Sequence, residues 1–479
     1  MYDICIVGAG AIGMNIAREL AKYKLRICVL EKEDDVSCGC SKANSGIVHG
    51  GYSDEPGTLK GELCVKGNRM YEQLNKELNF GYRKTGSLVL AFQEEEIPKL
   101  KELYEYGMGN GVQGLKIING DQAREMEPYL SKTVKAALYC ENAGVTSPYE
   151  FVIALAENAV ANQVVLKLNT EVTAIQQTEE YFKLITSNGE VMSKYVVNAA
   201  GIYSDKVAGM AGIEDYRITP RRGQYVVLDK EQNHLVKSVI FQVPTKLGKG
   251  ILVTTTYHGN LMVGPNAEEI NDKDDVGTDE KTLEYIVQTA RKSVPDFDVR
   301  KSLTSFAGNR PVSNLKDWII EESRVKKFIN LVGIDSPGLT SSPAIALKVV
   351  DILRQSGLAM EINPDFQPYR KPIIKKKDAD FYGSLDSLDP EHHIICRCEQ
   401  VTEAEIIDCL HREIPVRSLA AINRRTRTGM GSCQGAFCQP RVRQLVAREL
   451  NIPIQEVKER GTASSTLAQR AKRSELIKL

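Results

Sequence analysis

The chain has 479 residues, with 62 Lys and Arg balanced by 62 Asp and Glu, and 42% of its residues are apolar. This length predicts two or three domains, and the neutral charge excludes a global field that attracts nucleic acid or anionic membrane. Met1 leads directly into a structural motif and no apolar run is long enough to cross a bilayer, so we expect a cytoplasmic protein. Eleven cysteines are too few for a disulfide scaffold, and a close group of reduced cysteines is a candidate metal site.

A β-α-β pattern opens the chain. Residues 4–7 and 25–30 are predicted strands, and residues 14–23 are a predicted helix. Gly8, Gly10 and Gly13 fall between the first strand and the helix with G-x-G-x-x-G spacing, which lets the backbone approach a pyrophosphate at a helix N-terminus. Glu31 follows the second strand, where a carboxylate accepts hydrogen bonds from ribose hydroxyls. The pattern predicts a dinucleotide site for NAD or FAD, the alternative being a glycine-rich turn without a ligand.

Strand and helix patterns are mixed through the first 355 residues. Further predicted elements are strands at 87–92, 195–200, 225–228, 251–256 and 328–332, and helices at 98–106, 147–161 and 343–353. Periodicity then fades, and residues 356–390 are predicted to be a linker. A second domain is expected at 391–460, with helices at 402–410 and 441–450. The polar, basic tail 461–479 is expected to fray.

Small-residue segments elsewhere favour FAD as the dinucleotide. A loop over 41–51 follows Glu31 closely, a second segment ends a strand near residue 200, and a third precedes the helix predicted at 343. Backbone free of large side chains packs closely against phosphates and a flat ring, and a helix start can stabilise negative charge on the reduced ring. The candidate cofactor contacts are Ser41, Asn44, Ser45, Gly46, Val172, Ala200, Gly201, Gly333, Gly338, Leu339 and Thr340.

Four cysteines near the C-terminus are candidate metal ligands. Cys396 and Cys398 form a C-x-C pair, and Cys433 and Cys438 form a C-x4-C pair. Four thiolates can hold a [2Fe-2S] cluster. Structural zinc is the alternative, but zinc sites more often use C-x2-C pairs, so the spacing favours iron. Cys38 and Cys40 are interpreted as small residues lining the loop to the flavin.

Residues 1 to about 355 resemble the glycine-oxidase-type FAD superfamily, and most closely its L-2-hydroxyglutarate and glycerol-3-phosphate dehydrogenase branches. The resemblance rests on the glycine motif, Glu31, the loop 44–51 and the segments 198–201, 263–266 and 308–311. It implies an α/β, Rossmann-like FAD domain (about 1–80, 145–215 and 325–355) interleaved with an α+β, antiparallel-sheet substrate domain (about 81–144 and 216–324).

Residues 392 to about 455 resemble the bacterioferritin-associated-ferredoxin-like [2Fe-2S] domain, which implies a small helical C-terminal domain. The stretch 424–435 resembles the large subunit of anaerobic glycerol-3-phosphate dehydrogenase, a family that joins the same two modules in the same order. Two interpretations stay open for Arg424, Arg425 and Arg427. In the first interpretation they raise the reduction potential of the cluster or dock an acidic partner. In the second they form a solvated basic loop.

Two residues are the candidate catalytic pair. Arg310 occupies the place where the resembled family has a substrate-binding arginine, and its guanidinium matches a carboxylate or phosphate; the alternative is a salt bridge at a domain interface. His49 is the candidate proton acceptor because imidazole titrates near neutrality, the alternative being a histidine that only contacts the flavin. Lys249, Arg222 and Tyr257 are weaker pocket candidates.

These features predict an FAD-dependent dehydrogenase that oxidises the C–OH bond of a small anionic substrate, either glycerol 3-phosphate or a 2-hydroxy acid such as L-2-hydroxyglutarate. Electrons are expected to pass from FAD to the cluster and on to a partner. The expected partner is a second flavoprotein or iron–sulfur subunit in a hetero-oligomer, and this subunit could place the complex at the membrane surface. The segment 334–338 lacks the Gly-Gly-Lys of the glycerol-3-phosphate branch and is closer to the 2-hydroxyglutarate branch. Two alternatives are amine oxidation of the glycine, sarcosine or proline type and a non-catalytic electron-transfer subunit.

Overall fold

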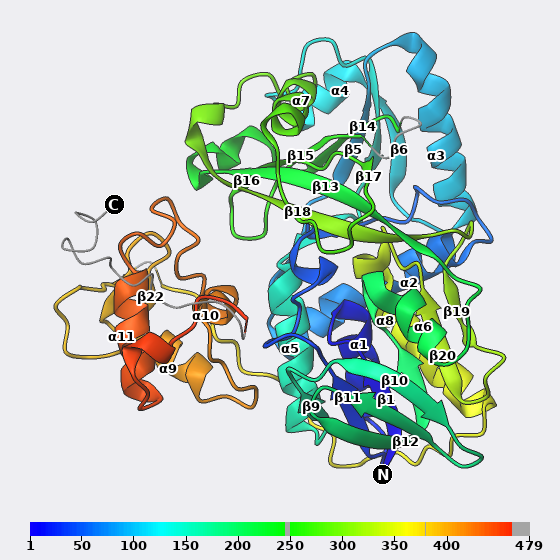
Figure 1. Ribbon diagram of the computed structural model, residues 1–479. Coiled ribbons are helices and arrows are strands. Elements are labelled where there is room, and N and C mark those ends of the chain that lie inside the picture. Colours follow the sequence, from blue (N-terminus) through cyan, green and yellow to red (C-terminus); the bar gives the residue numbers. More distant parts are fainter. Residues whose placement is uncertain (245–249, 379, 462–479) are drawn as a thin grey trace, which may run out of the picture. The chain divides into compact units, whose positions relative to one another are not determined.

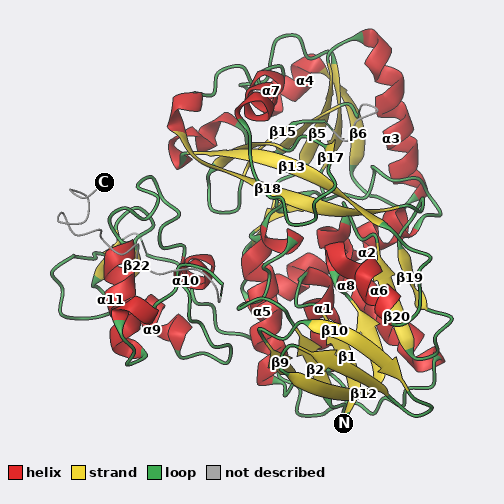
Figure 2. Cartoon of the chain, viewed as in Figure 1, coloured by secondary structure: helices red, strands yellow, loops and turns green. Residues whose placement is uncertain are grey.

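The computed structural model describes residues 1–244, 250–378 and 380–461, and divides the chain into two compact units (Figures 1 and 2). The larger unit contains Met1–Lys32 and Val36–Lys371. The smaller unit contains Glu33–Asp35 and the chain from Pro372 onward. The boundary falls inside the segment that the sequence predicts to be a linker. Lys249 and, after Gly461, the predicted tail lie outside the described residues.

The first sheet of the larger unit contains β1 (Tyr2–Val7), β2 (Ile27–Leu30), β9 (Val165–Lys167), β10 (Val172–Gln177), β11 (Phe182–Thr186), β12 (Gly189–Asn198), β19 (Ile319–Glu322) and β20 (Phe328–Val332). β1 pairs in parallel with β2 and with β12, and β12 pairs in parallel with β20. β10, β11 and β12 are antiparallel. Since the carboxyl ends of β1, β2, β12 and β20 meet at one edge, the loops that follow them gather there.

Helices pack beside this sheet: α1 (Ala11–Leu20), α2 (Leu59–Leu78), α5 (Pro148–Ala161), α6 (Ser204–Met210) and α8 (Gly338–Gln355). The helix predicted from residue 343 begins five residues earlier, so its predicted start was wrong. Pro343 has no N–H to donate to the Leu339 carbonyl. That carbonyl instead accepts from the Tyr71 hydroxyl at 2.6 Å and from Ser342 Oγ at 2.8 Å, and the helix continues through the proline.

The second sheet contains β5 (Ser87–Ala91), β6 (Leu115–Asn119), β7 (Ala136–Cys140), β13 (Ile218–Leu228), β14 (Val239–Gln242), β15 (Leu252–Thr255), β16 (Leu261–Gly264), β17 (Glu268–Glu269) and β18 (Ser302–Ser313). Its pairs are antiparallel apart from β5 with β14. Leu88 and Leu90 belong to the core under α4 (Gly120–Met126) and α7 (Glu280–Ala290), whereas Val89 belongs to the core under α3 (Ile97–Gly109). Because successive side chains of a strand point to opposite faces of the sheet, apolar residues are buried on both faces here.

Smaller elements complete the larger unit. A third sheet joins β3 (Ile47–Val48), β4 (Tyr82–Lys84) and β8 (Gly144–Thr146). Short 3-10 turns occur at η1 (Cys40–Lys42), η2 (Glu94–Glu96), η3 (Gly201–Tyr203), η4 (Lys230–Leu235) and η5 (Val299–Lys301). β3 fixes the loop after Glu31, because Ile47 pairs with Val145 and Val48 with Gly144.

The smaller unit contains β21 (Ile394–Cys396), β22 (Val401–Thr402), α9 (Glu403–Leu410), α10 (Leu419–Thr426), α11 (Gln439–Glu449) and η6 (Ile454–Glu456). Ile406, Leu419 and Val446 of the three helices are fully buried in one core. Thr402 caps α9: its side chain accepts from the Glu405 N–H, and the Glu405 carboxylate accepts from the Thr402 N–H at 2.9 Å.

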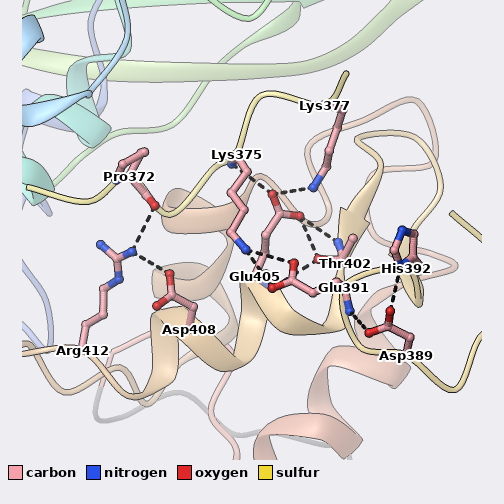
Figure 3. A network of polar contacts seen from close by, with 10 residues as sticks. All are labelled: Pro372, Lys375, Lys377, Asp389, Glu391, His392, Thr402, Glu405, Asp408 and Arg412. Carbon is pink, nitrogen blue, oxygen red and sulfur yellow. Dashed lines mark hydrogen bonds and ion pairs between the residues drawn. The ribbon is translucent and has the colours of Figure 1, made fainter. Parts of the chain in front are cut away.

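The segment that enters the smaller unit is bound to α9 by charged side chains (Figure 3). The buried Glu405 carboxylate accepts from Lys377 Nζ at 2.8 Å and from the Lys375 N–H at 3.2 Å. Lys375 Nζ also lies 2.9 Å from Glu391. Residues 372–391 are therefore held to this unit. Among the described residues, no helix combines the length and apolar content needed to cross a membrane.

Candidate functional site

The glycine turn after β1 is built so closely that side chains do not fit in it. A Cβ on Gly8 would lie 2.5 Å from the Ala199 carbonyl oxygen, and one on Gly13 would lie 2.0 Å from the Gly8 carbonyl oxygen. Gly8 has φ +107°, which favours glycine. The Glu31 carboxylate accepts from the Ala9 N–H at 2.8 Å. The turn and the acidic residue predicted to bind a dinucleotide therefore lie together at the N-terminus of α1.

The loop over 40–51 connects this turn to the rest of the larger unit. Ser41 Oγ accepts from the Ala11 N–H at 2.9 Å, at the start of α1. The Asn44 amide donates to the Cys40 and Ser41 carbonyls, and Asn44 Oδ1 accepts from the Gly46 N–H at 2.8 Å. The predicted residues of this loop thus hold one another in a fixed shape beside the glycine turn.

His49 lies at the junction of this loop with α8. Its N–H donates to Thr340 Oγ1 at 2.9 Å, and its carbonyl accepts from the Asn68 amide at 2.9 Å. Its ring stacks on Phe241 with centroids 5.8 Å apart. The predicted residues His49 and Thr340 are therefore in contact, although 291 positions separate them. Both main-chain groups of His49 are hydrogen-bonded, so the backbone beneath the imidazole is fixed.

Arg310 is held by neutral acceptors. Its guanidinium donates to the carbonyl oxygens of Asn266 at 2.6 Å, Arg221 at 3.3 Å and Arg222 at 3.4 Å. Gly223 makes room for it, since a Cβ there would lie 2.8 Å from Arg310 Nη2. Within the described part of the chain, Arg310 forms no ion pair with a carboxylate. The alternative of an interface salt bridge thus finds no support there, and no paired carboxylate offsets the charge of the guanidinium in that part of the chain.

Two neighbours of Arg310, Cys40 and Tyr225, stay uncharged at neutral pH. Burial raises the pKa of the Cys40 thiol to about 11 and the pKa of the Tyr225 hydroxyl to about 12, although Arg310 acts to lower both. The Tyr225 ring stacks on Phe306 with centroids 4.6 Å apart. Ser45 forms a side-chain hydrogen bond with Tyr225, so the flavin-loop candidates reach the Arg310 region.

The remaining cofactor candidates lie at strand ends. Ala200 Cα would lie 3.3 Å from a Cβ on Gly8, and Gly201 begins η3 with φ +57°. Gly333 follows β20 with φ +75°, and Gly338 begins α8, where Leu339 follows it. Val172, at the start of β10, is buried in the same core as Val7 and Leu30.

The weaker pocket candidates have structural partners. Arg222 lies 2.9 Å from Glu268 and 2.8 Å from Asp275, and these carboxylates raise its pKa against the opposing effect of burial. Tyr257 packs on Gly81, where a Cβ would lie 2.4 Å from its ring. These contacts give both residues a structural role.

The four predicted cysteine ligands lie together in the smaller unit. A side-chain hydrogen bond from Cys438 lowers the pKa of Cys396 to about 6, and the Phe437 N–H lowers the pKa of Cys433, which also contacts Cys398. Ser432 Oγ donates to Cys398 Sγ at 3.5 Å. The same contact with Cys396 raises the pKa of Cys438, so Cys396 is the member of that pair that ionises first. The thiolate is the form that binds iron.

The cysteine loops also approach each other closely. A Cβ on Gly431 would lie 2.2 Å from Cys398 Cβ, so only glycine fits there. Across the residues described, no three His, Cys, Asp or Glu side chains converge on one point as a single metal ion needs. Cys396 contacts Cys438 and Cys433 contacts Cys398, and these four thiols would be the ligands of a [2Fe-2S] cluster.

Sequence reasoning missed two carboxylates near these sites. Asp335, just before α8, accepts from the Trp318 indole N–H at 2.9 Å and lies 2.8 Å from Lys60 Nζ. Asp35, which belongs to the smaller unit, contacts Arg424 and Arg425. Each contact joins residues far apart in sequence, and no local motif marks either carboxylate.

Together, the glycine turn, the acidic strand end, the unneutralised arginine and the four thiols define a flavin-dependent oxidoreductase joined to an iron–sulfur domain. The family described as FAD dependent oxidoreductase matches residues 3–352, and the BFD-like [2Fe-2S] binding domain matches residues 394–448. The chain belongs to the FAD-dependent oxidoreductase family. The predictions of FAD, of a [2Fe-2S] cluster and of the mixed α/β fold with a small helical C-terminal domain are thereby confirmed.

Individual relatives are consistent with this assignment. The chain is 47% identical over 463 residues to a glycerol 3-phosphate dehydrogenase of Caloramator mitchellensis, covering 96% of each chain. It resembles the structure of dithionite-reduced L-α-glycerophosphate oxidase from Mycoplasma pneumoniae with FAD bound, at a TM-score of 0.74 and 31% identity, covering 77% of this chain and 98% of that one. It is 33% identical over 283 residues to human mitochondrial L-2-hydroxyglutarate dehydrogenase, covering 56% of this chain and 61% of that one.

Proposed function

We propose that the chain is a glycerol-3-phosphate dehydrogenase that oxidises the secondary hydroxyl of its substrate and delivers the electrons to a partner protein. The observation that carries this proposal is the 47% identity to a glycerol 3-phosphate dehydrogenase over 96% of both chains, which includes the iron–sulfur domain. When bound, FAD would accept a hydride from the substrate, and the cluster would pass electrons on one at a time.

Arg310 binds the phosphate group of the substrate in this proposal. Its guanidinium is oriented by three main-chain carbonyls, and these neighbours do not offset its charge, because the carbonyl acceptors are neutral and Cys40 and Tyr225 stay protonated. A cation held in place before the substrate arrives loses little entropy on binding, and charge-assisted hydrogen bonds to phosphate are stronger than neutral ones.

His49 takes the hydroxyl proton in this proposal. The hydrogen on carbon leaves as hydride, and the proton on oxygen needs a base with a pKa near neutrality. The contacts of its backbone with Thr340 and Asn68 and the stacking of its ring on Phe241 support a fixed imidazole at the junction of the flavin loop and α8. The proposed metal ligands are Cys396, Cys398, Cys433 and Cys438.

A 2-hydroxy acid is the second candidate substrate. It is favoured by the identity to L-2-hydroxyglutarate dehydrogenase and by the segment Ile334-Asp335-Ser336-Pro337-Gly338. Asp335 places a carboxylate at this segment, where its pairing with Lys60 leaves no excess positive charge. A dianionic phosphate gains more than a carboxylate from a free cation, so we rank glycerol 3-phosphate first.

Anaerobic reduction of the flavin tests the proposal. Purified protein is mixed with sn-glycerol 3-phosphate, L-2-hydroxyglutarate, glycine or L-proline, and the loss of the oxidised flavin band is followed. We expect rapid bleaching by glycerol 3-phosphate alone. The Arg310→Met variant should raise the substrate concentration needed for half-maximal bleaching at least about 100-fold, equivalent to about 3 kcal/mol. Arg324→Met, which removes an exposed, ion-paired arginine, is the matched control. Bleaching by an amino acid, or by none of the four, would contradict the proposal.

We further propose that the electron acceptor is a second flavoprotein or iron–sulfur subunit, that the complex is a hetero-oligomer, and that it works in the cytoplasm or at the membrane surface through that subunit. A domain of the BFD-like [2Fe-2S] type supports a route for single electrons out of the chain. Isolation of the chain from its native cells as a homomeric protein that reduces only oxygen would contradict this.

A further inference from the structure

An aromatic side chain with two arginines stacked on it marks the surface beside the cysteine ligands. The Phe437 side chain is exposed, at 40% of its full area. The guanidinium carbons of Arg397 and Arg441 lie 4.9 Å and 4.7 Å from the centre of its ring. These three residues form what we call the Arg-Phe-Arg patch. Cation–π contact holds both arginines over an exposed aromatic ring.

The two arginines of the patch carry positive charge that the described chain does not neutralise. Neither Arg397 nor Arg441 pairs with a carboxylate among the described residues, and Arg441 Nη1 is covered by protein there without a hydrogen-bond acceptor. No Asp or Glu occurs between Glu413 and Glu449. Five other arginines in that interval have carboxylate partners in the described structure, whereas Arg417 has none: Arg424, Arg425, Arg427, Arg443 and Arg448 are paired.

The patch is continuous with the proposed cluster ligands. Arg397 lies between Cys396 and Cys398, and Phe437 immediately precedes Cys438. The Phe437 N–H donates to the Cys433 sulfur, while its ring is exposed. One residue therefore touches a ligand sulfur with its backbone and solvent with its side chain. A protein that covers the Phe437 ring comes within one residue of the thiols.

We propose that the Arg-Phe-Arg patch is the docking surface for an acidic electron-accepting protein. This rests on the proposed function, in which the cluster passes electrons to a partner. Aromatic and arginine side chains are the residues that most often dominate binding at protein interfaces. Carboxylates of the partner would pair with Arg397 and Arg441, and an apolar group would cover the ring. Unpaired charge at the rim of an interface mainly raises the association rate constant. This increase becomes smaller as the salt concentration rises.

The test measures electron transfer from the holoenzyme to two cytochromes in a stopped-flow instrument. The protein is first reduced with dithionite, so the reaction does not depend on the substrate. Cytochrome b5, whose haem edge is ringed by carboxylates, is the acidic acceptor, and cytochrome c is the basic one. The variants are Arg397→Glu combined with Arg441→Glu, and Arg417→Glu as the control. Arg417 is an exposed arginine of the same unit without a carboxylate partner in the described chain.

We expect the second-order rate constant with cytochrome b5 to fall with rising salt, and the double reversal to lower it about tenfold or more at low salt. The control should change it less than twofold, and the double reversal should accelerate cytochrome c. Equal effects of the double reversal and the control, or a rate independent of salt, would overturn the proposal. If the double reversal loses iron, Arg397→Gln with Arg441→Gln replaces it, with about a threefold decrease expected.

Two further outcomes are distinguished. The reduced protein can also be tested for binding to anionic vesicles of phosphatidylglycerol. If the double reversal abolishes vesicle binding and leaves the cytochrome rates unchanged, the patch binds a membrane and the proposal is overturned. The rate with cytochrome b5 can show the expected salt dependence even if none of the candidate substrates bleaches the flavin. That result would contradict the proposed function but would still support the docking surface.

Discussion

Asp35→Asn should destabilise the iron–sulfur unit although residue 35 precedes the rest of that unit by more than 300 positions. The Asp35 carboxylate is 1% exposed and lies 2.8 Å from Arg425 through both of its oxygens and 2.6 Å from Arg424. Removing one member of a buried ion pair costs about 3–5 kcal/mol, because the remaining charge stays buried. The substitution keeps the shape of the side chain and removes its charge.

Hydrogen exchange in α10 measures this loss, since Arg424 and Arg425 belong to that helix. A loss of about 3–5 kcal/mol corresponds to exchange faster by a factor of roughly 10² to 5 × 10³. Asp34→Asn, which removes the same charge one position earlier, should change the free energy of opening by about 0.5 kcal/mol or less. If both variants leave α10 equally protected, the buried pair does not stabilise the unit as argued.

Acid should erase the difference between Asp35→Asn and the wild type. Burial acts to raise the pKa of Asp35, but Arg425 and then Arg424 outweigh it, so its pKa in the folded state is lowered. A carboxyl with a lowered pKa stabilises the fold above its ordinary pKa, near 4, and this stabilisation is lost as the pH falls through the lower, folded value. The protection of α10 should therefore converge in the two proteins at strongly acidic pH and remain apart at pH 7.

Three further predictions concern the cofactors and the segment that enters the smaller unit. Gly13→Ala should weaken FAD binding at least about 100-fold, equivalent to about 3 kcal/mol, because its Cβ would lie 2.0 Å from the Gly8 carbonyl oxygen; the flavin-to-protein absorbance ratio of the purified variant measures this. Cys433→Ser should lose iron and acid-labile sulfide while keeping FAD, and its flavin should still be bleached by substrate. Glu405→Gln should lower the stability of the smaller unit by about 1–3 kcal/mol, because its carboxylate binds Lys377 at 2.8 Å and the Thr402 N–H; urea unfolding followed by the cluster absorbance measures this, and an unchanged midpoint would contradict it.

Periodic segments were predicted well from sequence. The helix expected at 147–161 is α5 (Pro148–Ala161), and the strand expected at 328–332 is β20 (Phe328–Val332). Such elements are set by local pattern, since apolar residues recur at the period of the element. The start of α8 was predicted wrongly because a proline usually occupies the first turn of a helix. The hydroxyl of Tyr71, which satisfies the carbonyl that Pro343 leaves free, comes from another helix.

The sites divide in the same way. The glycine turn and the cysteine pairs are local motifs whose spacing carries the chemistry, so sequence sufficed to propose them. Arg310 also belongs to a short motif, but its three carbonyl acceptors come from Arg221, Arg222 and Asn266. Nothing in the neighbouring sequence indicates that these acceptors are neutral. That neutrality decides whether the guanidinium is available to an anion.

The arginines of the smaller unit show why charge counted along the sequence does not identify a docking surface. Arg424, Arg425 and Arg427 form a conspicuous basic run, which the sequence leaves open to several interpretations: a solvated loop, a docking role, or an effect on the potential of the cluster. In the structure all three are buried and paired, the first two with Asp35 and the third with Glu399. Their charge is compensated inside the protein, so the solvated-loop interpretation is wrong. These three arginines also present no accessible charge on which a partner could dock. Arg397 and Arg441 lie outside this run, yet they are the arginines beside the thiols for which the described chain shows no carboxylate partner.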